Sequence, residues 1–112
     1  MSWTIENALE DEEINRACVL HNEYEIAIGE LSIPIRIRIW RLLKGHAKFA
    51  FTQSHFIHTP VQGGPHVTSS SHADEEAYAL HLAINTLLPH YKEAVAKKHE
   101  PNDAWLIPNA HF

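Results

Sequence analysis

The fold of this chain is decided by residues 33–40, which read Ile33-Pro34-Ile35-Arg36-Ile37-Arg38-Ile39-Trp40. Successive side chains of a β-strand point to opposite faces, so the four isoleucines share one face and the arginines and tryptophan share the other. Proline cannot donate a ladder hydrogen bond and belongs at the start or the edge of a strand. The stretch therefore predicts a strand with one buried face and one face turned toward water.

Two further strands are expected on either side of this segment. Residues 24–28 alternate and are rich in β-forming residue types, and residues 29–32 supply a turn or bulge. Residues 44–46 contain a glycine suited to a hairpin turn, and residues 47–58 again have the character of a strand. The sequence thus predicts a three-stranded antiparallel sheet over about residues 24–58.

A long helix is expected over about residues 72–98, with Ser71 and Asp74 as a capping box at its start. Pro89 removes a backbone donor and crowds the preceding turn, which predicts a kink near this residue. An apolar stripe at helical spacing is expected to cover the isoleucine face of the sheet: Ala77, Leu80, Ile84, Leu87, Tyr91 and Val95.

The remaining segments complete a single α+β domain over residues 1–112. Thr4 can cap a short helix that runs to about Asn15, and a turn is expected near residues 21–22. Residues 59–71 are rich in glycine, proline and serine and predict a flexible loop. Residues 101–112 form an extended tail whose apolar residues, Trp105, Leu106 and Ile107, are expected to dock on the body.

Composition places the chain among small soluble proteins. Its 112 residues are 45% hydrophobic, which is enough to close one core without staples. No apolar run approaches the roughly 18 residues of a membrane span, and the N-terminus lacks the basic start and apolar run of a secretory signal. A single cysteine, Cys18, excludes an internal disulfide and agrees with a reducing compartment. We therefore expect a cytoplasmic protein without a membrane partner.

Charge is unevenly distributed along the chain. Residues 1–30 hold eight acidic side chains against the single Arg16, whereas five basic residues and no acid occur from residue 31 to residue 48. The net charge of −5 disfavours a generic nucleic-acid binder, because phosphate affinity needs clustered cations. Our interpretation is that the two patches partly neutralise each other in the fold, and the alternative is a dedicated anionic partner.

Ten histidines invite a metal hypothesis, but their spacings do not support it. Histidines nine residues apart on one helix, such as His72 and His81, point in opposite directions. A small metal-dependent hydrolase built from His58, His66 and His72 around the loop stays an alternative. Residues 69–74 contain the residue types of a hydrolytic triad, which a helix cap explains better. We expect no metal, no cofactor and no enzymatic activity.

The outer face of the sheet is the candidate functional site. It is expected to carry Arg36, Arg38 and Trp40 together with Lys48 and His58. Arginine and tryptophan are common in the energetic centres of protein interfaces. The sequence thus predicts a regulatory or adaptor module that binds a protein partner, or itself, through this face or a sheet edge. Two alternatives stay open: pairing of the arginines with acids of the same chain, and single-stranded nucleic-acid binding on the same face.

Overall fold

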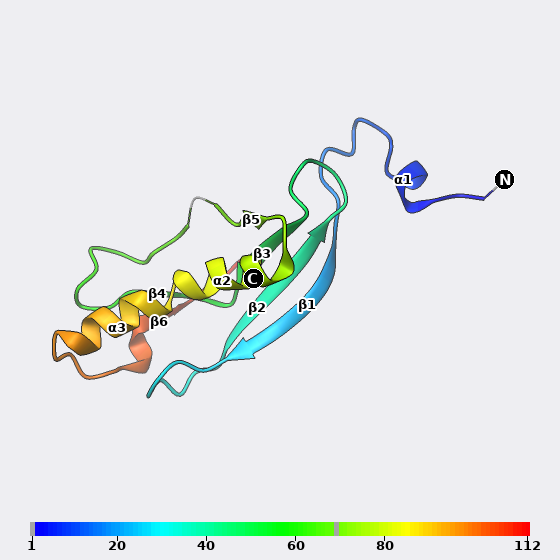
Figure 1. Ribbon diagram of the computed structural model, residues 1–112. Coiled ribbons are helices and arrows are strands. Elements are labelled where there is room, and N and C mark those ends of the chain that lie inside the picture. The colour runs from blue at the N-terminus through cyan, green and yellow to red at the C-terminus, as the bar shows by residue number, and fades with distance from the viewer. Residues whose placement is uncertain (1, 69) are drawn as a thin grey trace.

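The computed structural model describes residues 2–68 and 70–112 and shows an α+β fold in which a bent pair of helices lies along one face of an antiparallel sheet (Figure 1). Within these residues no helix is both long and apolar enough to cross a membrane. The four-stranded sheet has the order β1-β2-β3-β5, and a two-stranded sheet pairs β4 with β6. The elements, in chain order, are α1 (Ile5–Ala8), β1 (Cys18–Ile26), β2 (Ile35–Leu42), β3 (Phe49–Gln53), β4 (His55–Ile57), β5 (His72–Ala73), α2 (Glu76–Asn85), α3 (Leu88–Ala96), a 3-10 turn (Asp103–Trp105) and β6 (Leu106–Pro108).

The two-sided strand expected from the sequence is confirmed. Ile35, Ile37 and Ile39 of β2 are each 0% exposed, whereas Arg36 on the opposite face is exposed. Pro34 lies immediately before the strand, where its missing donor costs no ladder bond. The alternation of β2 therefore sets which face of the sheet meets the helices.

The sheet has four strands, so the expected number of three is wrong. Ala73 and His72 pair with Phe49 and Ala50, and the backbone N–H of Phe51 donates to the carbonyl of Ser71 at 3.0 Å. The expected helix start at residue 72 is also wrong, because this backbone is bonded to the edge of β3. Helix α2 begins only at Glu76, and no side chain caps it.

Strand β1 begins at Cys18, well before residue 24, and the expected turn near residues 21–22 is a register shift between Leu20 and Asn22. This strand forms one edge of the sheet, and seven of its nine residues are exposed. An exposed edge strand needs no apolar alternation, so the sequence pattern does not predict where this strand begins.

The expected strand over residues 47–58 is two strands that belong to different sheets. Strand β3 ends at Gln53, the chain bends at Ser54, and β4 then pairs with β6 of the C-terminal segment. The buried Gln53 side chain donates through Nε2 to the carbonyl of His55 at 2.8 Å and to Thr86 Oγ1 at 2.9 Å. These bonds stabilise the bend, since they satisfy polar groups that have lost access to water.

The N-terminal helix is shorter than expected, and the long C-terminal helix is divided in two; both differences have local causes. The N-terminal helix is present and capped by Thr4, but it ends at Ala8, and Asp11 instead accepts a bond from the N–H of Glu13 at 2.9 Å. The bend near Pro89 is confirmed: α2 stops at Asn85, and Pro89 sits in the first turn of α3, where no intrahelical donor is needed.

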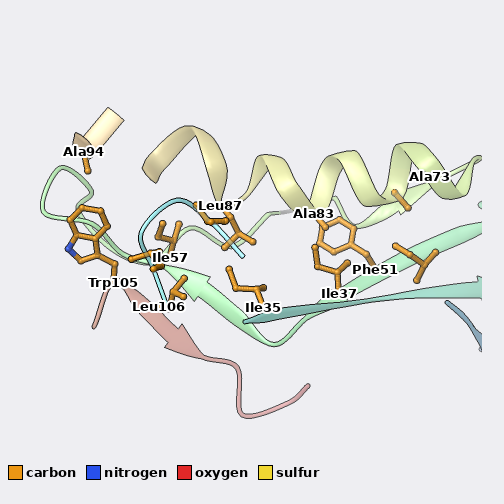
Figure 2. Packing of buried hydrophobic residues seen from close by; sticks show 14 residues of the cluster. Ile35, Ile37, Phe51, Ile57, Ala73, Ala83, Leu87, Ala94, Trp105 and Leu106 are labelled. Carbon is orange, nitrogen blue, oxygen red and sulfur yellow. The ribbon is translucent and has the colours of Figure 1, made fainter. Parts of the chain in front are cut away.

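The core lies between the helices and the isoleucine face (Figure 2). Ala79, Ala83 and Leu87 are fully buried there, and Trp105 closes the far end of the core beside Ala94. The expected stripe is partly wrong, because Ala77 is exposed and Val95 is 41% exposed. Small alanines face the sheet, which lets the helix approach it closely, while the larger Leu80 and Ile84 are only partly buried.

Two contacts hold α3 against the rest of the fold. Gly29, in the connection between β1 and β2, has φ +52°, and the Tyr91 hydroxyl lies only 2.1 Å from where a Cβ would stand. The Tyr91 hydroxyl also accepts a bond from the N–H of Glu30 at 3.1 Å. On the loop side, the rings of His66 and His90 lie 4.8 Å apart between centroids.

We predict that Gly29→Ala lowers the free energy of unfolding by about 2 kcal/mol or more, because the left-handed backbone and the Tyr91 contact both exclude a methyl group. Urea unfolding measures the change. Gly63→Ala is the matched control, since nothing lies within 4 Å of its Cβ position, and we expect it to change stability by less than about 0.5 kcal/mol. Equal stability of the two variants would contradict this account of Gly29.

We predict that His90 makes the fold acid-sensitive. Burial lowers its pKa, the neighbouring His66 lowers it further, and Glu93 partly offsets both. The unfolded chain therefore takes up a proton near pH 6.5 before the folded chain does, so stability is lost as pH falls below about 6.5. His90→Gln should reduce the difference in unfolding free energy between about pH 7.5 and about pH 5.5. His99→Gln, at an exposed histidine, should leave that difference unchanged.

Candidate functional site

The face of the sheet opposite the helices carries the side chains that the sequence singled out. Residues that pair directly across antiparallel strands share a face, so the register places this outer face without ambiguity. Its members on β1, β2, β3 and β5 are Cys18, Leu20, Glu23, Glu25, Arg36, Arg38, Trp40, Leu42, Ala50, Thr52 and His72.

Arg38 is already engaged by groups of its own chain. Its Nε donates to Glu23 Oε1 at 2.7 Å, and its Nη1 donates to the carbonyl of Phe112 at 3.1 Å. The hydrogen bond from Arg38 is the main reason that the pKa of Glu23 lies below its usual range. The pairing of an outer-face arginine with an acid from the N-terminal part of the chain is therefore present, with Glu23 as the partner.

Phe112 covers this end of the outer face. Its ring centroid lies 3.9 Å from the guanidinium carbon of Arg38 and 5.1 Å from that of Arg36. Asn109 brings the segment here, since its side chain donates to the carbonyl of Gln53 at 2.9 Å. Sequence reasoning did not identify Phe112, because no local pattern connects residue 112 with residue 38.

At the other end of the same face, the structure has an open groove of about 440 Å³, which we call the sheet groove. Trp40 lines it, and the Trp40 Nε1 donates to Thr52 Oγ1 at 2.9 Å, so the indole has no unpaired donor to lose on contact with a ligand. Its walls combine apolar and cationic residues: Arg16, Trp40, Leu42, Lys44, Ala50 and His72 are among them.

Lys44 fixes the wall of the sheet groove that comes from the N-terminal segment. Its ammonium donates to the carbonyl of Asp11 at 2.9 Å and also to the carbonyl of Ile14. The N–H of Leu43 donates to the carbonyl of Ala17 at 2.9 Å. These bonds hold residues 11–17 beside the β2–β3 turn and place Arg16 on the groove. In the sequence, Arg16 is distinguished only because it is the single basic residue in an acidic segment.

The five predicted site residues do not all meet. Arg36, Arg38 and Trp40 share the outer face, and Lys48, whose carbonyl accepts from the N–H of Leu42 at 2.8 Å, lies at its turn end. His58 lies elsewhere: it follows β4, its N–H donates to the carbonyl of Trp105 at 2.8 Å, and its Nε2 lies 3.2 Å from the carbonyl of Gln62. The bend at Ser54 removes His58 from the face that a continuous strand would have given it.

On the helix side, Glu76 is contacted by three polar side chains of β1. Asn22 Nδ2 and the Tyr24 hydroxyl donate to its Oε2, the latter at 2.7 Å, and His21 Nε2 lies 3.4 Å from its Oε1. The bond from Asn22, followed by that from Tyr24, lowers the pKa of Glu76, and the same carboxylate raises the pKa of Tyr24. A carboxylate held ionised in this way is a weak base, so these contacts serve to tie α2 to β1.

The hypotheses of a metal site and of a hydrolytic triad find little support among the described residues. No group of three or more His, Cys, Asp or Glu side chains in residues 2–68 and 70–112 is arranged to hold a metal ion. Of the residue types considered for a hydrolytic triad, Ser69 lies outside the described residues, and His72 belongs to β5 on the sheet edge.

We compared the chain with protein-family models, with curated proteins and with solved structures, and none of the three comparisons gave a match.

Proposed function

We propose that the protein is a non-enzymatic regulatory or adaptor module that binds an acidic, partly apolar segment of a protein partner in the sheet groove. The observation that supports this most directly is the composition of the groove. It places the indole of Trp40 and the apolar Leu42 and Ala50 beside the cations of Arg16 and Lys44. Such a surface suits a ligand that carries apolar side chains next to carboxylates.

The cations of the groove are available to a ligand. Among the described residues no carboxylate pairs with Arg16, and the Lys44 ammonium meets only carbonyl oxygens. A partner carboxylate would therefore meet positive charge without first displacing an acid of this chain. The tryptophan supplies the large contact area that the centres of protein interfaces commonly have.

Single-stranded nucleic acid is the second candidate, and the contact of Phe112 with Arg36 and Arg38 is what favours it. A base could stack on these guanidinium groups as the Phe112 ring does. Against it stand the net charge of −5 and the prior engagement of Arg38 by Glu23. Phosphate binding needs several free cations and weakens steeply with salt, so we rank it second.

We predict that Arg16→Glu weakens binding of an acidic, tryptophan-containing peptide at least tenfold, because it places a carboxylate on the groove. Fluorescence anisotropy of the labelled peptide gives the affinity, and circular dichroism verifies the fold. Lys92→Glu makes the same charge change on an exposed residue of α3 and should leave the affinity within about twofold.

The same titration separates the two candidate functions. Labelled oligothymidylate is the nucleic-acid probe, measured at low and at physiological salt. Tight, steeply salt-dependent binding of this oligonucleotide, with no binding of the peptide, would replace our proposal with the second candidate. Equal peptide binding by Arg16→Glu and Lys92→Glu would exclude the sheet groove as the binding surface.

A further inference from the structure

We infer that the occupant of the sheet groove is the N-terminal arm of a second copy of the chain, residues 2–10, so that two copies bind each other reciprocally. This inference rests on the proposed function of the groove and names its partner. It follows from three features of the arm: its exposed apolar side chains, its charge and the direction in which it leaves the body.

The arm exposes large apolar side chains that none of the residues 2–68 and 70–112 covers. Trp3 is 77% exposed and Ile5 is 68% exposed, and α1 contains no buried residue. A helix of four residues is far too short to be stable by itself in water. Exposed apolar groups gathered on one segment are typical of binding sites, and Thr4 already caps α1 in a form ready to dock.

The charge of the arm is complementary to that of the groove. Residues 2–10 contain two acids, Glu6 and Glu10, and no base. The groove carries Arg16 and Lys44, and Lys48 lies at the turn end of the same face. Two copies, each with a net charge of −5, repel each other as wholes, and an approach of arm to groove offsets this repulsion because it brings opposite charges together.

The arm of the same chain is directed away from its own groove. Lys44 donates to the carbonyls of Asp11 and Ile14, and we call these two bonds the Lys44 clamp. On the N-terminal side of the clamp, α1 lies away from the sheet (Figure 1). The protein consequently measures 64 × 24 × 23 Å, with a radius of gyration of 17.0 Å, where a compact chain of this length has about 13 Å. Docking on a second copy leaves the bonds of Lys44 to Asp11 and Ile14 in place.

Reciprocal exchange gives a closed, two-fold symmetric dimer, because each copy offers one arm and one groove. The contact is small: one tryptophan buries about 150–250 Å², and interfaces below about 1,200 Å² are usually transient. The dimer should therefore dissociate on dilution and weaken as salt rises.

Sedimentation velocity over a range of protein concentrations tests the inference. We expect wild type to dimerise reversibly and the arm variant Trp3→Ala/Ile5→Ala to need at least tenfold higher concentration. Ile107→Ala is the matched control, because it removes an exposed apolar side chain from β6, away from arm and groove, and it should dimerise as wild type does. A wild type that is monomeric at every concentration would overturn the inference.

A mixing experiment identifies the surfaces involved. The groove variant Arg16→Glu and the arm variant should each fail to self-associate, yet an equimolar mixture should form heterodimers, because one intact arm still meets one intact groove. A dimer that persists in both variants would instead use another surface, such as the open edge of β1, and would also overturn the inference.

The outcomes distinguish this inference from the function on which it rests. Binding of the acidic probe peptide by a monomeric wild type would leave the groove as a protein-binding site with another partner and would remove only the second copy as its occupant. Unchanged probe binding by Arg16→Glu, together with a dimer that this variant and the arm variant both retain, would remove both.

Discussion

Burial of the β2 isoleucines beneath α2 determines which face of the sheet is turned toward water. Ile35, Ile37 and Ile39 are completely removed from water, and each fully buried aliphatic side chain contributes about 1.5–3 kcal/mol. Since side chains alternate along a strand, this burial obliges Arg36, Arg38 and Trp40 to occupy the other face. The candidate binding surface is thus a geometric consequence of the core.

What the sequence could predict is what local patterns encode. The alternation of residues 33–40, the place of Pro34 and the bend near Pro89 follow from the properties of single residues and their neighbours, and all three are found. Strand β5 could not be predicted in this way, because only pairing with a distant edge makes a strand of two residues. The division of residues 47–58 likewise depends on a partner strand, β6, that lies about fifty residues further along the chain.

The residues of the candidate site likewise divide into those that a local pattern predicts and those that depend on distant parts of the chain. The residues of β2 were found from the sequence, whereas the groove beside Trp40 was not, because Arg16 reaches it only through the bonds of Lys44 to the backbone of residues 11 and 14. His58 was assigned to the face by counting along one continuous strand, and the bend at Ser54 invalidates that count. Long-range hydrogen bonds, which have no sequence period, decide these positions.

The two ends of the outer face differ in whether their cationic side chains are already paired. At the Arg38 end, Glu23 and Phe112 satisfy the guanidinium, so a ligand there would have to replace contacts that already exist. At the Trp40 end, the cations of Arg16 and Lys48 face no acid of the described residues. The acids that could balance them lie on the arm, which the Lys44 clamp points outward. One lysine therefore both builds the wall of the groove and directs the N-terminal arm of its own chain away from that groove.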